Sequence, residues 1–81
     1  MKLFPNPTEG YVRVEVRGAG DAAFLPLRIL DGSGRVVRYG RLATYGAFTK
    51  GVVSLYGLPA GVYYLKFQHE QFPEWYPVVK E

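Results

Sequence analysis

The sequence of 81 residues contains no cysteine and only one histidine, His69. Without cysteine the chain cannot form disulfides, thiolate metal sites or a cysteine nucleophile. The absence of cysteine also leaves undetermined whether the chain works in an oxidising or a reducing compartment. A lone histidine offers little for a hydrolase triad or a zinc site. Hydrophobic packing must hold the fold together. We expect no catalytic residues, no metal and no cofactor.

Long hydrophobic runs are also missing, because no stretch approaches the roughly 18 apolar residues that a membrane-spanning helix requires. Pro5 and Pro7 follow closely on Met1, which is unlike the start of a secretory signal peptide. We therefore expect neither a membrane span nor a signal peptide within these residues. If the protein is exported, the export signal of the general pathway lies elsewhere.

The chain has only a small excess of positive charge, because ten Lys and Arg residues against seven Asp and Glu residues give a formal net charge of +3. The basic residues are spread along the chain, and only Arg35, Arg38 and Arg41 cluster. On a strand, alternation would send Arg35 and Arg41 to one face and Arg38 to the other. We expect no nucleic-acid binding.

Helical periodicity is absent, whereas Gly and Pro recur about every ten residues between segments rich in Val, Tyr, Leu and Phe. With 48% apolar residues, the chain has the composition of one globular domain over residues 1–81. This pattern predicts an all-β fold, a seven-stranded antiparallel immunoglobulin-like β-sandwich. The expected strands are 2–4, 11–17, 24–30, 36–41, 51–54, 61–69 and 74–79.

Local patterns support several of these elements. Val12, Val14 and Val16 alternate with charged residues, which predicts a strand with one buried face. The segment Asp31-Gly32-Ser33-Gly34 predicts a tight hairpin, with both glycines free to adopt positive φ. Gly18 to Asp21 predicts another turn, and residues 40–51 read as an irregular, mobile loop.

Aromatic residues make up 16% of the chain and suggest an alternative function. A row of exposed rings would stack on sugars, and Trp75, Tyr76 and Tyr45 are the candidates. In the segment 72–77, alternation sends Trp75 and Tyr76 to opposite faces, so one of them should be exposed. The chain would then be a carbohydrate-binding or adhesive β-sandwich module.

Two proline motifs frame the chain. In Leu3-Phe4-Pro5-Asn6-Pro7 the two prolines fix φ and withhold two amides, which predicts an edge strand followed by a turn. In the segment 58–63, Pro59 and Gly61 surround one small residue and predict a sharp corner before the strand that begins near Tyr63.

In this order and spacing, the motifs resemble the C-terminal sorting domain of proteins exported by the type IX (Por) secretion system of Bacteroidetes. That family opens with a Leu-Tyr-Pro-Asn-Pro-like motif, in which Phe4 here replaces the tyrosine. Its middle strand and turn are similar to the segment that contains Asp31 and Gly34. Its late Leu-x-x-Gly-x-Tyr motif is matched by Leu58, Gly61 and Tyr63.

The resemblance implies a non-enzymatic secretion signal at the C-terminal end of a larger cargo protein. The cargo would enter the periplasm by the general pathway and leave through the outer-membrane type IX translocon. A sortase-like peptidase would then usually remove the domain by a cut upstream of it, and the cargo would be attached to the cell surface or released.

We hypothesise that the translocon recognises the last strand together with the late corner. An end strand can pair with the sheet edge of a partner. The alternative is that these residues only complete the sheet and shape a turn. Edge strands rich in Val and Tyr also leave room for a homodimer. The recognition candidates are Leu58, Pro59, Gly61, Tyr63, Val78, Val79, Lys80 and Glu81.

Overall fold

The structure, a computed structural model, describes residues 2–17, 23–69 and 75–81. The turn predicted at residues 18–21 and the segment 72–74 lie outside these residues. The expected strands are present, although the one predicted to reach His69 ends at Phe67. The strands are β1 (Lys2–Phe4), β2 (Tyr11–Arg17), β3 (Phe24–Leu30), β4 (Val36–Tyr45), β5 (Phe48–Ser54), β6 (Gly61–Phe67) and β7 (Trp75–Lys80).

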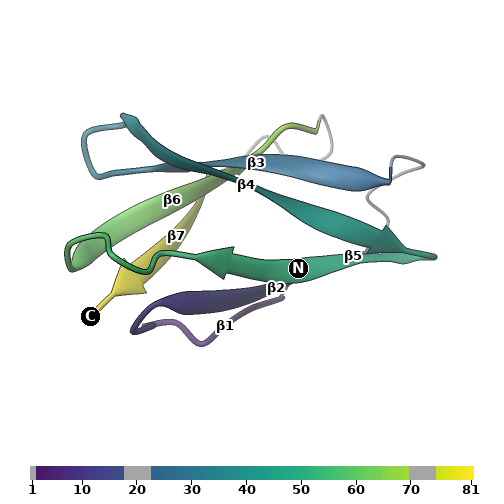
Figure 1. Ribbon diagram of the computed structural model, residues 1–81, viewed down its shortest axis with the longest axis horizontal. Helices are drawn as coiled ribbons and strands as arrows, with labels where there is room; N and C mark the ends of the chain where they lie inside the picture. The colour runs from purple at the N-terminus through teal and green to yellow at the C-terminus, as the bar shows by residue number, and fades with distance from the viewer. Residues whose placement is uncertain (1, 18–22, 70–74) are drawn as a thin grey trace.

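All seven strands belong to one curled sheet, in the order β1-β2-β5-β4-β3-β6-β7, with antiparallel neighbours throughout. The predicted all-β, seven-stranded antiparallel fold is confirmed, but the division into an immunoglobulin-like sandwich is not. The reason lies in β4, which pairs with β3 and then, at its end, with β5. This strand carries the hydrogen bonding from the upper to the lower part of the sheet (Figure 1).

The core lies inside the curl because side chains on each strand alternate between its two faces. Val12, Val14 and Val16 are almost completely buried, as predicted, whereas Arg13 and Arg17 are exposed. Leu25, Leu27 and Ile29 face them from the other side of the curl. The buried core cluster is Val12, Val14, Val16, Leu25, Leu27, Ile29, Leu42, Val53, Leu55, Tyr63, Leu65, Phe67 and Val78.

The prediction of an irregular loop at residues 40–51 is wrong. This stretch contains the end of β4, a turn at Gly46 and the start of β5. Because Thr44 and Thr49 lie opposite each other and their hydroxyls are 3.1 Å apart, two polar residues here fit a regular hairpin. Polar composition concealed the strand pattern.

Beyond this hairpin, β4 and β5 diverge, since their pairing covers only residues 43–45 and 48–50. Arg38 spans part of the gap, and its guanidinium donates hydrogen bonds to the carbonyls of Ser54 (3.1 Å) and Tyr56 (2.9 Å). Arg38 is half-buried while Arg41 is exposed, which agrees with alternation along β4. Arg35 lies in the turn before the strand.

Strand direction decides where the connections lie. Each odd-numbered strand pairs only with even-numbered ones, and every pair is antiparallel. The β1–β2, β3–β4 and β5–β6 connections therefore fall at one end of the sheet, together with the end of β7. Figure 1 shows the β3–β4 turn, the β5–β6 connection and the C-terminus on the left.

Candidate functional site

The sequence motifs come together at this end of the sheet, although they are spread over the whole chain. We call it the motif end and define it by residues 5–8, 31–34, 58–63 and 77–81. Gly61 pairs with Lys80 and Tyr63 with Val78, so the late corner and the last strand are direct neighbours. The two halves of the predicted recognition site therefore lie side by side.

The opening motif holds the outer edge of β7. The Asn6 carboxamide donates to the carbonyl of Pro77 (3.2 Å), and its oxygen accepts from the amide of Val79 (2.9 Å). These two bonds imitate the pairing of a neighbouring strand. Two residues later, the Thr8 amide donates to the carbonyl of Val79, and the Thr8 carbonyl accepts from the amide of Glu81, both at 2.8 Å.

Thr8 is anchored in turn by its own side chain. Its hydroxyl donates to the carbonyl of Tyr11 at 2.6 Å and accepts from the amide of Gly10 at 3.2 Å. The residue is only 3% exposed, and it makes a parallel bridge to Lys80. Sequence reasoning missed Thr8 as a positioning residue, because a threonine after a proline also fits a simple turn.

Pairing by Asn6 and Thr8 covers the edge of β7 from Pro77 to Glu81. Pro77 itself has no amide to offer at this edge, where proline is best tolerated in a sheet. The segment 6–8 thus links β1 and β2 to the opposite edge strand of the sheet. A partner strand cannot pair with this part of β7 while the segment is in place.

The middle motif forms the β3–β4 turn as predicted. Asp31 Oδ1 accepts from the amide (2.9 Å) and hydroxyl (2.6 Å) of Ser33 and from the amide of Arg35 (3.1 Å). These bonds hold the pKa of Asp31 below its ordinary value, with the Ser33 hydroxyl as the largest cause and the Arg35 amide next. Of the two glycines, only Gly34 has a positive φ, at 87°.

The late motif is fixed by its tyrosine and its glycine. The Tyr63 hydroxyl donates to the carbonyl of Pro59, four residues upstream, at 2.5 Å. This contact has the form of the tyrosine corner of β-sandwich proteins. Gly61 has a φ of 155°, which residues with a side chain rarely adopt. Finally, the ammonium of Lys80 donates to the carbonyl of Leu58 at 2.7 Å and joins the corner to the last strand.

A comparison with protein families shows the family to which this chain belongs. The family model described as the secretion system C-terminal sorting domain matches residues 2–75. The chain belongs to this family. It is a C-terminal sorting domain of the type IX secretion system, as its motifs suggested. Searches of the curated proteins and of the solved structures gave no significant match.

Membership of the family establishes the function in outline. The sorting domain is a type IX C-terminal secretion signal, and a family of this kind is generally non-enzymatic. It implies a cargo protein, the type IX secretion machinery and export through the outer membrane to the cell surface or the extracellular space. The family does not support the carbohydrate-binding alternative.

Burial divides the recognition candidates of the sorting domain into two groups. Tyr63 and Val78 are buried in the core, and Leu58 and Lys80 are half-buried. These four shape the motif end and offer little surface to a partner. The exposed candidates are Pro59, Gly61, Val79 and Glu81.

A shallow hollow lies beside the exposed candidates. It has a volume of about 350 Å³ and lies between the β3–β4 turn at residues 31–33 and the late corner at residues 60–63. The middle and late motifs therefore line a common surface. The opening motif meets the same end of the sheet through β7.

The proposed sugar-stacking rings do not form a row. Trp75 is 48% exposed on β7 and makes an edge contact with Tyr64, at 6.1 Å between ring centroids. Tyr76 packs inward against Phe67, so one ring of the pair is exposed, as predicted. Tyr45 lies on β4, and β3 and β6 separate it from β7 in the sheet.

Within residues 2–17, 23–69 and 75–81, no cluster of three or more His, Cys, Asp or Glu side chains is placed to hold a metal ion. Among the same residues there is no helix of the length and apolar character needed to cross a membrane.

Proposed function

We propose that residues 1–81 act as one sorting domain whose motif end is read by the outer-membrane translocon. The observation that carries this proposal is the convergence of the opening, middle and late motifs with β7 at one end of the sheet. Asn6, Tyr63 and Lys80 fix this end through contacts to the backbone. A domain that is recognised but catalyses no reaction needs a rigid surface for its partner to bind.

We further propose that recognition uses side chains and not strand pairing with β7. The backbone groups of Val79 are engaged by Asn6 and Thr8, so strand addition there would first require residues 6–8 to leave. The exposed side chains of Pro59, Val79 and Glu81 remain accessible on the closed surface. Leu58, Tyr63, Val78 and Lys80 contribute by holding the shape.

The remaining steps of the pathway are part of the same proposal. The cargo on the N-terminal side enters the periplasm by the general pathway, and a sortase-like peptidase removes the domain by a cut upstream of it. The direction of β1 leaves room for the cargo and for the cut. Since β1 runs toward the motif end, Lys2 lies away from it, and the cargo and the cut would not compete with a bound translocon.

As a second proposal, the domain forms a homodimer through its edge strands. With β7 covered from residue 77 onward, the outer edge of β1 is the more accessible backbone edge for a second copy. Its strand has only three residues, which limits such a contact.

The test is export of a fluorescent reporter that carries a signal peptide in front and residues 1–81 behind, in a bacterium with a working type IX system. The reporter should reach the medium or the cell surface, and it should stay in the periplasm when residues 77–81 are deleted. Export of the deleted form would refute the role of the motif end.

A matched pair of point variants separates recognition from folding. Val79 (38% exposed) and Val52 (55% exposed) are both exposed valines on strands, the first at the motif end and the second on β5. We expect Val79→Lys to reduce export about tenfold, as truncation of a central contact does in other interfaces, and Val52→Lys to leave it unchanged. Equal export of the two variants, with both folded, would contradict recognition at Val79.

A further inference from the structure

The outer face of β1, β2 and β5 carries a second surface, which shares only Phe4 with the sequence motifs. We call it the basic face. Because the registers place Lys2 opposite Glu15 and Glu15 opposite Lys50, alternate residues of these strands point to the same side. Its members are Lys2, Phe4, Arg13, Glu15, Arg17, Phe48, Lys50 and Val52, with Tyr45 of β4 at its border.

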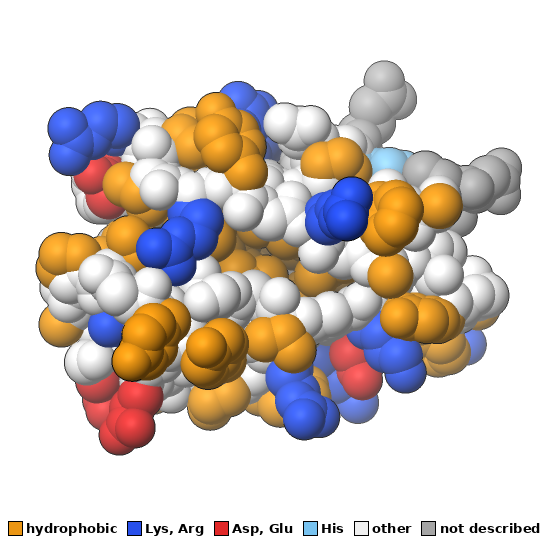
Figure 2. Space-filling model, viewed as in Figure 1, with side chains coloured by type: hydrophobic (Ala, Val, Ile, Leu, Met, Phe, Trp, Pro, Cys, Tyr) orange, Lys and Arg blue, Asp and Glu red, His pale blue; other side chains and the backbone are white. Residues whose placement is uncertain are grey.

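Charge on this face is not neutralised internally. Four cations surround one carboxylate, Glu15, which forms no ion pair within the described part of the chain. The other carboxylates that the structure describes, Glu9, Asp31 and Glu81, belong to the motif end or lie beside it. In Figure 2 the red side chains lie mainly at the left, while blue and orange ones are interleaved over the rest of the view.

Aromatic rings accompany the cations. The guanidinium of Arg17 lies 5.7 Å from the centroid of the Phe48 ring, and the ammonium of Lys50 lies 5.6 Å from that of Tyr45. Phe48 is 46% exposed and Tyr45 61% exposed. Such an accumulation of exposed apolar surface in a soluble domain marks an interaction site.

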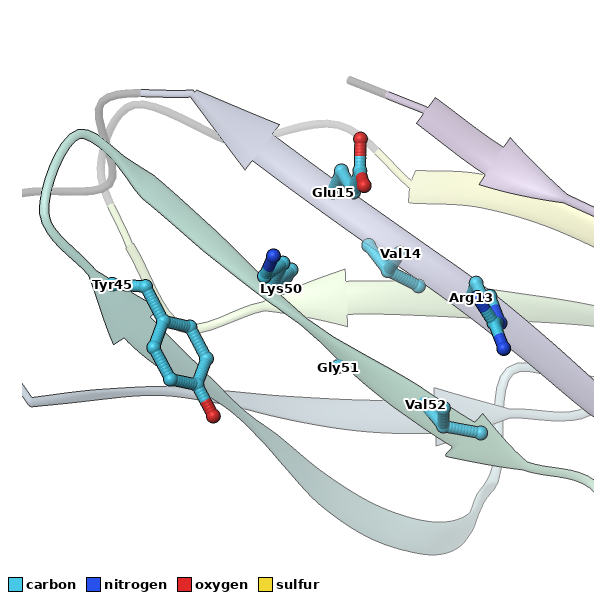
Figure 3. A pocket seen from close by; sticks show the side chains of 7 residues that line it. All are labelled: Arg13, Val14, Glu15, Tyr45, Lys50, Gly51 and Val52. Atoms are coloured by element: carbon cyan, nitrogen blue, oxygen red, sulfur yellow. The ribbon is translucent and has the colours of Figure 1, made fainter.

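The face is open and only shallowly hollowed. One depression of about 310 Å³ lies between Arg13, Tyr45 and Lys50, and another of about 280 Å³ lies between Lys2, Arg17 and Phe48. Figure 3 shows Arg13 and Glu15 on β2 beside Lys50 and Val52 on β5, with Tyr45 next to them. Neither of these two depressions gathers all four cations.

We propose that the basic face docks on an anionic lipid surface. Arg13 and Arg17 are separated by roughly 13 Å along β2, and Lys2 and Lys50 by two strand spacings of roughly 5 Å each. One small anion could reach one or two of these groups, whereas lipid phosphates repeated in a plane can meet all of them. Exposed rings between cations are also the pattern of proteins that lie at a lipid interface.

The location of the protein agrees with this partner, since export takes it through the outer membrane. Lipid binding is independent of the motif end and does not rest on the proposed reading by the translocon. Until the domain is cut off, lipid binding would hold the exported cargo close to the membrane surface while the motif end stays accessible.

The experiment is co-sedimentation of residues 1–81 with vesicles of phosphatidylcholine alone or mixed equally with phosphatidylglycerol. We expect binding only to the mixed vesicles, and weaker binding as ionic strength rises. Binding equal on both vesicles, or none on either at low salt, would overturn the proposal. So would binding to soluble polyglutamate without binding to vesicles, which would assign the face to an acidic protein.

Three variants locate the binding surface. Arg13→Glu should lower the partition onto mixed vesicles about tenfold or more. Arg35→Glu, the same charge reversal on an exposed arginine beside the motif end, should change it less than about twofold. Glu15→Gln removes the lone carboxylate of the face and should raise binding about fivefold. Equal losses for Arg13→Glu and Arg35→Glu would show a response to net charge alone and refute the face.

Discussion

The motif end and the basic face differ in how their side chains are used. At the motif end, the side chains of Asn6, Asp31 and Tyr63 form hydrogen bonds with the backbone of the domain itself. On the basic face, the side chains of Lys2, Arg13 and Glu15 make no hydrogen bond or ion pair within the described residues. Only stacking of cations on Phe48 and Tyr45 organises that face.

This difference explains why the motif end has recognisable motifs, whereas the basic face shares only Phe4 with them. A side chain that satisfies a particular backbone amide can be replaced by few others, so its identity and spacing appear as a motif. A cation that faces solvent needs only its charge, and Lys or Arg at nearby positions serves equally well. The motifs therefore mark the residues that build the shape of the motif end, and only some of them lie on its surface.

The sharpest way to test the contrast is to remove apolar volume on both sides of the sheet. Leu55 is fully buried just after β5, near the motif end, and Val52 on the basic face is 55% exposed. Leu55→Ala should lower the free energy of unfolding by about 2–5 kcal/mol. Val52→Ala should lie within about 0.5 kcal/mol of the unchanged protein. Urea unfolding followed by tryptophan fluorescence measures both, and similar losses would remove the contrast.

The edge contacts of Asn6 provide a test of intermediate size. Asn6→Ala deletes two hydrogen bonds and should cost about 1–2 kcal/mol. Asn6→Asp keeps the oxygen that accepts from Val79 but cannot donate to Pro77 when ionised, so its loss should be smaller. Hydrogen exchange at the Val79 amide should accelerate most in Asn6→Ala. Unchanged protection of that amide in Asn6→Ala would show that the side chain does not hold β7.

The smallest expected effect concerns pH and Asp31. Because folding lowers the pKa of this carboxyl, its ionised form stabilises the folded state, fully so above the unfolded pKa of about 4. The contribution disappears as pH falls through the lower folded pKa. Asp31→Asn should therefore flatten the dependence of thermal stability on pH below about 4 and leave a small deficit at neutral pH. Parallel acid profiles of the two proteins would contradict this role.

Much of the fold could be predicted from the sequence, because strand alternation and turn residues are local signals. The alternation of Val12, Val14 and Val16 predicted a buried face, and Asp31 with Gly34 predicted the hairpin, both correctly. The number of strands followed from the spacing of Gly and Pro. The hairpin at residues 46–47 was missed because Thr44 and Thr49, which pair with each other, are polar.

Pairing between distant strands left no local trace. Whether the strands form one curled sheet or two sheets depends on where β4 stops pairing with β3 and starts pairing with β5. No sequence pattern near Ala43 indicates this change of partner. The contacts of Asn6 with β7 were equally hidden, since they join residues 71 and 73 positions apart. The motifs could be recognised, but the reason for Asn6 required the structure.

The contacts of residues 6–8 with β7 also bear on when the domain can fold. A chain that enters a compartment from its N-terminal end presents β1 and β2 long before β7 arrives. Contacts of such high sequence separation form late, because the intervening chain must first be ordered. Until the last strand has emerged, the sheet lacks its final strand, and residues 6–8 have no edge to cover. The motif end is therefore complete only after the whole domain has emerged and folded.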